Sequence, residues 1–249
     1  MKFFKLIKLY FQRNFVFRLN FAMSWGTTIL KFLFTILFWL CAMNNTSYDF
    51  LYSNKEMFIY FFVIMLIGLF IESDVTGKVA NSIFYGNLVT DILKPISHHT
   101  LYFTNTIAMK LFLFAAIVCI SVILVFIPSY SNLFVVSLLV SFFINFEMNY
   151  LIGLFAFWTN TVWGISMVNT VLIDVFGGRL FPIALSGLLM KKICAYLPYQ
   201  YIYYVPTQIL EQKFGFEAIL MQLTYAFILF FVSKIVFKCG LKRFEAVGV

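Results

Sequence analysis

The chain has 249 residues, of which 63% are hydrophobic and 11% are charged, and its mean hydropathy is +0.95. A water-soluble domain of this length could not cover its surface with so few charged side chains, so the composition excludes one and predicts an integral membrane protein. The net charge of +8 comes from cations that flank apolar segments. This placement favours loops that follow the positive-inside rule over a nucleic-acid-binding surface.

The first 20 residues interleave lysine and arginine with apolar side chains. We expect residues 1–20 to form an amphipathic helix that lies along the membrane interface; a cluster of charge that only sets topology is the alternative. The cations are spread along the segment and no small-residue cleavage pattern comes after it. We therefore expect it to be retained rather than removed as a signal peptide.

Apolar segments of about 20 residues are long enough to cross the hydrocarbon core of a membrane. The chain contains six, so we predict an all-α integral membrane protein in which residues 1–249 form one transmembrane domain. Placing both termini in the cytoplasm puts most lysine and arginine residues on the inner side. The predicted spans are residues 21–43, 57–74, 106–127, 133–157, 162–181 and 216–237.

A polar segment, residues 76–100, separates the second and third predicted spans on the cytoplasmic side. Its apolar residues recur at near-helical spacing, and Gly86 and the Lys94-Pro95 pair interrupt the pattern. A short helix lying across the cytoplasmic face would suit a peripheral partner protein. An ordinary amphipathic loop on the lipid headgroups is the alternative.

We single out four ionisable residues within the predicted spans, because an unpaired charge in the membrane is costly and is usually functional. Lys110 and Glu147 lie at similar depth on consecutive antiparallel spans, so we predict that they form a structural ion pair. Lys31 either extends toward the inner interface or faces the bundle interior. The fourth residue, Asp174, belongs to the fifth span.

One stripe of the fifth span carries polar, small and adaptable residues at helical spacing, among them Asn160, Met167, Thr170, Asp174 and Gly177. We take Met167, Thr170 and Asp174, together with Lys31, as candidates for lining a translocation path. A close helix–helix contact is the alternative, and it suits Asn160 and Gly177 better.

After the fifth span, residues 182–211 are aromatic and broken by prolines. Gly177, Gly178 and Pro182 end the span, and Pro198 and Pro206 interrupt the segment itself. Non-helical backbone at membrane depth must be buried in protein or line a watery cavity, because lipid cannot satisfy its polar groups. We therefore predict that this outward-facing segment re-enters the membrane and is part of a path or gate.

The sequence predicts no catalytic chemistry, metal site or cofactor in this chain. His98 and His99 are adjacent, so on a helix they cannot face one metal ion, and we expect a solvated pair. No phosphate-binding GxxxxGK[ST] motif occurs, so another subunit would have to bind ATP. The cysteines show neither zinc nor disulfide spacing; they are Cys41, Cys119, Cys194 and Cys239.

Several soft, positional motifs resemble those of permease subunits of bacterial ABC-2 type exporters, and the likeness covers nearly the whole chain. The matching segments are YGNLVTDILKPIS at residues 85–97, AFWTNTVWG at 156–164, FGGRLFP at 176–182, LPYQYIYYVPTQIL at 197–210 and GLKRFEAVG at 240–248.

The resemblance implies a permease that pairs with a second permease, as a homodimer or heterodimer, in the bacterial cytoplasmic membrane and in contact with its lipids. Residues 76–100 would contain a coupling helix that docks a cytoplasmic ABC ATPase dimer, which carries ATP and Mg²⁺. Residues 182–211 would form re-entrant outer helices. The implied coupling residues are Tyr85, Gly86, Asn87, Leu88, Lys94 and Pro95, and the implied outer-gate residues are Gly178, Arg179, Pro182, Pro198, Tyr199 and Pro206.

From this resemblance we expect a non-catalytic subunit of an ATP-driven exporter for an amphiphilic or hydrophobic compound, such as a drug, an antibiotic or a peptide-like molecule. Export of a lipid-linked glycan or polysaccharide by the same architecture is the alternative. An intramembrane enzyme and a membrane scaffold without transport fit less well. An enzyme would need converging acids, histidines or a metal cluster, which the sequence does not offer.

Overall fold

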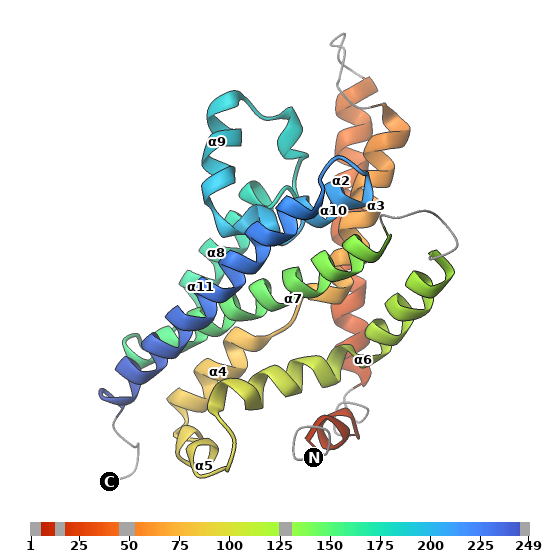
Figure 1. Ribbon diagram of the computed structural model, residues 1–249. Coiled ribbons are helices and arrows are strands. Elements are labelled where there is room, and N and C mark those ends of the chain that lie inside the picture. The colour runs from red at the N-terminus through yellow and green to blue at the C-terminus, as the bar shows by residue number, and fades with distance from the viewer. Residues whose placement is uncertain (1–5, 13–17, 45–52, 125–130, 245–249) are drawn as a thin grey trace.

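The computed structural model describes residues 6–12, 18–44, 53–124 and 131–244, and within these ranges every regular element is a helix (Figure 1). Residues 6–12 are helical, within the segment predicted to lie along the membrane interface. The long helices are α2 (Arg18–Asn44), α3 (Asn54–Ile71), α6 (His98–Leu124), α7 (Ser131–Leu154) and α11 (Phe216–Leu241). The short elements are α4 (Val75–Phe84), α5 (Leu88–Ile92), η1 (Phe155–Phe157), α8 (Trp163–Phe176), η2 (Ile183–Leu185), α9 (Leu188–Tyr196), η3 (Pro198–Tyr201) and α10 (Tyr204–Leu210).

The all-α class is confirmed, whereas the six-span topology stays a prediction. In the described chain, four stretches are long and apolar enough to cross a membrane: Gly26–Met43, Asn54–Phe84, Asn132–Phe157 and Phe216–Leu241. The 14 residues of α8 extend only about 21 Å at 1.5 Å per residue, less than the ~30 Å hydrocarbon core. The predicted third span falls in α6, which is 27 residues long but is not among the four.

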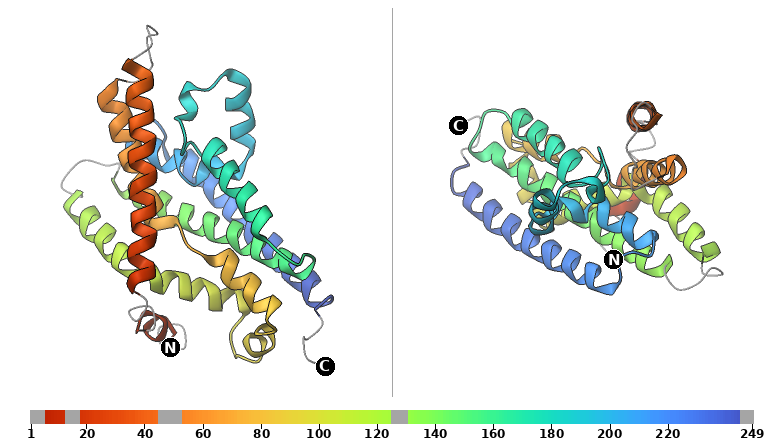
Figure 2. Two further views of the ribbon diagram at one scale, coloured as in Figure 1. Left: turned by 180° about the vertical axis from the view of Figure 1, so that it is seen from behind. Right: turned by 90° about the horizontal axis from the view of Figure 1, so that it is seen from above.

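Helix α7 forms the centre of the bundle, with α3, α4, α6, α8, α10 and α11 all packed against it (Figure 2). Its middle is buried on nearly every side, including Phe142, Ile144 and Phe146. A helix that is apolar all round is stable only when other elements surround it, which explains this central position.

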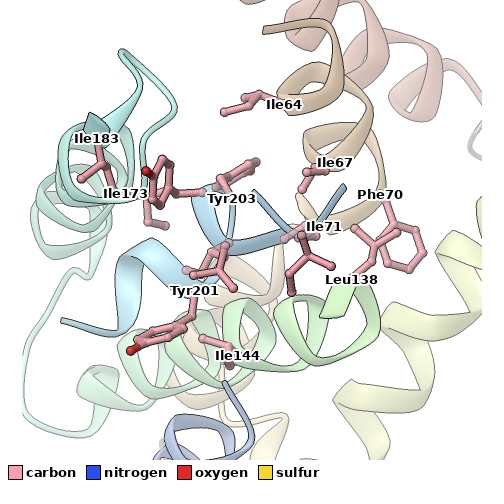
Figure 3. Packing of buried hydrophobic residues seen from close by; sticks show 14 of the residues in the cluster. Ile64, Ile67, Phe70, Ile71, Leu138, Ile144, Ile173, Ile183, Tyr201 and Tyr203 are labelled. Carbon is pink, nitrogen blue, oxygen red and sulfur yellow. The ribbon is translucent and has the colours of Figure 1, made fainter. Parts of the chain in front are cut away.

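The larger apolar core lies where α3 and α7 meet the segment that comes after α8 (Figure 3). Ile67 and Ile71 of α3 and Ile144 of α7 surround Tyr201 and Tyr203, all of them buried. The proline-broken segment is therefore packed into the bundle and does not project away from it.

A smaller core joins α4 to the C-terminal part of α7 and to α11. Gly153 of α7 allows close approach here, because a Cβ at this position would lie 2.7 Å from Cβ of Val79. Gly240 of α11 is equally confined, since a Cβ there would overlap the ring of Phe157. The first contact holds α4 against α7, and the second holds α11 against η1.

The two ends of the bundle differ. The helical residues 6–12, helix α5 and the last turn of α11 lie toward one end, while α9 lies toward the other (Figures 1 and 2). That residues 1–20, residues 76–100 and the C-terminal end share one side of the membrane stays a prediction.

Candidate functional site

A cavity of about 170 Å³ lies between α2, α3 and the turn after α8. Its wall combines four charged side chains with aromatic and aliphatic ones. The lining residues are Thr28, Lys31, Phe32, Thr35, Phe61, Ile64, Met65, Gly68, Glu72, Asp174, Arg179 and Leu180. We call this space the charged cavity.

Glu72 contacts three of the polar residues around the charged cavity: Arg179, Thr28 and Lys31. Its Oε1 accepts a hydrogen bond from Nη1 of Arg179 at 2.6 Å, and its Oε2 accepts one from Thr28 Oγ1 at 3.2 Å. Nζ of Lys31 lies 3.9 Å from Oε1, which is beyond hydrogen-bonding distance. One carboxylate thus connects α2, the end of α3 and the turn after α8.

Arg179 contacts a second carboxylate on the other side of the cavity, because its Nε forms an ion pair with Oδ1 of Asp174. The guanidinium also lies 5.7 Å from the ring centroid of Tyr203, a cation–π arrangement. Burial raises the pKa of Tyr203 well above its usual range, so its hydroxyl stays protonated beside Arg179. Two cations and two carboxylates leave the cluster neutral, which is the arrangement that low-dielectric surroundings favour.

Glycines explain how Arg179 reaches this position. Gly178 has φ of +79°, and a Cβ there would lie 2.9 Å from the hydroxyl oxygen of Tyr60, so this turn requires glycine. The Tyr60 hydroxyl donates to the Gly178 carbonyl at 2.6 Å, and Nε1 of Trp39 donates to the Leu180 carbonyl at 2.9 Å. Side chains of α2 and α3 thereby hold the backbone on both sides of Arg179.

The structure brings together some of the predicted path residues and separates others. Lys31 and Asp174 both line the charged cavity, and the Lys31 side chain is 56% exposed. Met167 and Thr170 are exposed and lie away from it, because α8 buries the face that carries Asn169 and Ile173.

The predicted ion pair between Lys110 and Glu147 is wrong, because each residue has another partner. Nζ of Lys110 donates to the Leu69 carbonyl at 2.6 Å, and Oε1 of Glu147 lies 2.5 Å from Nε2 of His99. The prediction counted residues from the connection between α6 and α7 and assumed that the two helices start level. In the structure His99 lies opposite Glu147, on the same face of α6 as Lys110 but about three turns earlier.

The histidines are also placed differently from the prediction of a solvated pair. Nδ1 of His98 lies 2.9 Å from the Tyr150 hydroxyl, and the ring stacks on Phe237 with 4.9 Å between centroids. His99 contacts Glu147 inside the bundle. The signal available in the sequence was one acid within a predicted span and two histidines close to the start of the preceding span.

Glu72 was not identified from the sequence as a candidate site residue, for a different reason. It lies at the last turn of the second predicted span, where a carboxylate is expected to meet water, and so it was not counted among the ionisable residues of the spans. The signal in the sequence was a carboxylate within the predicted span 57–74, and such residues are rare in membrane spans. The structure gives Glu72 φ of −61° and ψ of 128°.

A second candidate surface lies at the end of the bundle where α4 turns into α5, and we call residues 84–95 the α4–α5 tip. Gly86, with φ of +73°, makes the turn, and Leu88 is fully buried beneath it. Tyr85 and Leu93 are 74% and 80% exposed. Val89 and Ile92 are exposed as well, so the α4–α5 tip presents an apolar surface at the end of the molecule.

A buried acid holds the α4–α5 tip in shape. Asp91 accepts hydrogen bonds from Lys94 Nζ at 2.6 Å, Tyr102 Oη at 3.1 Å and Ser82 Oγ at 3.3 Å. Of the predicted coupling residues, Leu88 therefore serves as an anchor inside the fold. The others are at the surface or partly so: Tyr85, Gly86, Asn87, Lys94 and Pro95.

The predicted outer gate corresponds to η2, α9, η3 and α10, which we call the outer segment together with the turn at residues 177–182. Pro198 begins η3, and Pro206 lies within α10 and is buried. Tyr199 is half-buried, and Pro182 precedes η2. The Tyr201 carbonyl accepts hydrogen bonds from Ser141 of α7 at 2.8 Å and Gln222 of α11 at 2.9 Å, which fixes the middle of the segment.

The side chains of the charged cavity are suited to binding a ligand through ion pairs and hydrogen bonds. In the described part of the chain no three histidine, cysteine or acidic side chains form a group that could hold a metal ion. The cavity pairs an apolar wall with groups that can form ion pairs and hydrogen bonds.

Most of the chain is similar to a known family of membrane proteins. Residues 29–248 match the family model described as ABC-2 family transporter protein. A search of curated proteins returns no match.

Proposed function

Because the chain belongs to the ABC-2 family of transporter proteins, and is thereby a transmembrane component of an ABC transporter, we propose that it is the permease subunit of an ATP-driven exporter. It binds no nucleotide itself in this proposal. A cytoplasmic ABC ATPase dimer carries ATP and Mg²⁺, and a second permease, identical or similar, completes the membrane part.

The observation that carries the proposal is the α4–α5 tip. Exposed apolar side chains at one end of a membrane bundle are suited to insertion into a groove on a peripheral protein. Tyr85 and Leu93 project from the turn, while buried Leu88 and Asp91 keep its shape. We assign the ATPase to this surface, and thus the tip to the cytoplasmic side.

The outer segment supports the second half of the proposal. It packs against α3, α7 and α11 through buried tyrosines, and the charged cavity lies beneath its first turn. Closing one end of a path while the other end binds an ATPase is the arrangement that alternating access requires. We propose export as the direction because the sequence motifs resemble those of ABC-2 type exporters.

The charged cavity also supports an amphiphilic cargo. Phe32, Phe61 and Ile64 form an apolar wall, and the groups around Glu72 and Asp174 form a polar one. A ligand with an apolar body and one polar or charged group matches both walls.

The experiment that tests the proposal measures co-purification of an ABC ATPase from the source cell with the permease. The double variant Tyr85→Ser/Leu93→Ser should be inserted in the membrane normally and lose at least about tenfold of the bound ATPase, as expected when exposed apolar anchors are removed from an interface.

The matched control is Leu189→Ser in α9, which changes a leucine that is 76% exposed at the other end of the bundle. It should co-purify with the ATPase as the unchanged protein does. Undiminished binding by the double variant would overturn the assignment of the α4–α5 tip.

A further inference from the structure

The chain is interrupted once within the apolar stretch Asn54–Phe84, at the three residues between α3 and α4. The backbone at Glu72 is extended, and Asp74 caps α4 by accepting a hydrogen bond from the Gly77 N–H at 3.2 Å. Residues that join two helices absorb changes in backbone angle more easily than residues within them. Glu72 thus stands at a hinge.

Helix α4 on one side of this hinge is bound to α7. Thr76 Oγ1 donates to the Asn149 carbonyl at 3.0 Å, and Val79 is in close contact with Gly153. The α4–α5 tip continues directly from this unit. A force on the tip therefore reaches α3 through the hinge at Glu72.

The Glu72 side chain joins the hinge to the outer segment. Arg179, one residue after the turn at Gly178, donates to Glu72 at 2.6 Å and also pairs with Asp174 of α8. If Glu72 withdrew, Arg179 would keep its contact with Asp174, so α8 would retain it. The outer segment would lose its ionic link to α3.

Glu72 has a second cation within reach. Nζ of Lys31 is 3.9 Å from the same oxygen that binds Arg179, and in the part of the chain that the structure describes it has no shorter ionic contact. The Glu72 side chain is about one-third exposed and borders the charged cavity, so it has room to move between the two cations. Two available partners for one carboxylate provide the two discrete arrangements that a switch needs.

We propose that Glu72 is a latch between the α4–α5 tip and the outer segment. The latch is closed when Glu72 binds Arg179 and released when a turn of the hinge transfers the carboxylate to Lys31. The proposal rests on the proposed function for the source of the force, an ATPase bound at the tip. The exchange between the two cations is a property of this chain alone.

The test measures how fast a maleimide reagent labels Cys194, which lies in α9 of the outer segment, is 1% exposed and packs in the larger apolar core. The purified protein is placed in lipid nanodiscs, where both faces are accessible, with the other cysteines replaced by serine. Glu72→Gln should be labelled about tenfold faster, the change expected when the closed state loses a charge-assisted hydrogen bond.

Lys31→Met gives the decisive second readout. Removing the alternative partner favours the closed latch, so labelling should be slower by about twofold, which matches the weak interaction of a partly exposed pair. If the two ion pairs only stabilised the fold, both variants would be labelled faster. Opposite signs for the two variants therefore support the latch.

Glu56→Gln is the matched control, because it makes the same chemical change on the same helix, at a residue that bonds Ser53. It should leave the labelling rate unchanged. If Glu72→Gln does not fold, Arg179→Lys provides the same test, since lysine keeps the charge but loses the planar fork of donors.

The proposal would be overturned if folded Glu72→Gln protein were labelled at the wild-type rate. It would also be overturned if Lys31→Met were labelled faster than the unchanged protein. These measurements need no ATPase, so they stand even if the ATPase does not bind the tip. With the ATPase and ATP present, labelling of the unchanged protein should accelerate while Glu72→Gln shows no further increase. If ATP accelerated labelling equally in the unchanged protein and in Glu72→Gln, residues other than Glu72 would couple the ATPase to the outer segment.

Discussion

His99 and Glu147 meet inside the bundle, with 2.5 Å between Nε2 of the imidazole and Oε1 of the carboxylate. Ser233 of α11 donates to the other carboxylate oxygen at 2.6 Å, and Glu147 is 0% exposed. A single acid thus joins α6, α7 and α11. Networks of this kind fix helix packing when every member is satisfied.

Removing one member of this network should destabilise the protein strongly. His99→Phe leaves the Glu147 carboxylate with Ser233 alone, and we expect the free energy of unfolding to fall by about 3 kcal/mol. The measurement is thermal unfolding of the purified protein in detergent, supported by the yield of folded protein.

The double variant His99→Phe/Glu147→Met removes the buried charge together with its partner and should recover part of that loss. The introduced phenylalanine ring would then face an apolar side chain instead of a carboxylate. If the two single changes simply add, the residues do not interact in the folded protein.

Lys110 and Glu147 should behave independently. Lys110 donates to the Leu69 carbonyl and not to the acid on α7, so Lys110→Met and Glu147→Gln should each lower stability by a separate mechanism. In a double-mutant cycle of thermal stability, the sum of the single effects should match the double variant within about 0.5 kcal/mol. A coupling well above that value would restore the ion pair that the sequence predicted.

The turn at Gly178 should tolerate no other residue without cost. Gly178→Ala forces a positive φ on alanine and brings its Cβ against the Tyr60 hydroxyl, so we expect a loss of about 2–3 kcal/mol in the free energy of unfolding.

Gly164→Ala is the control for this change, because Gly164 lies within α8 and has open space around its Cβ position. It should be neutral or slightly stabilising in the same thermal unfolding assay. Equal effects at the two glycines would show that the Tyr60 contact does not hold the turn.

The helical class and the breaks in the outer segment could be predicted because their signals are local. Long apolar stretches indicate membrane helices, and Gly178, Pro198 and Pro206 mark places where a helix cannot continue. Such signals need no knowledge of neighbouring helices.

The partners of the charged residues could not be predicted, because they depend on how far each helix is shifted and rotated against the next. The axial position of α6 places His99 instead of Lys110 opposite Glu147. The burial of residues 76–84 could not be predicted for the same reason, because this segment is polar in sequence. Val79 and Ile83 nevertheless bury one face of α4 against α7 and α11.

The central claim is that this chain exports amphiphiles by using an ATPase bound at the α4–α5 tip. The direct measurement is ATP-dependent accumulation of a panel of fluorescent amphiphiles in inside-out membrane vesicles that contain the chain and its ATPase. We expect accumulation with the unchanged protein and none with Tyr85→Ser/Leu93→Ser. Equal accumulation with the tip variant, or none of any probe with the unchanged complex, would contradict the account.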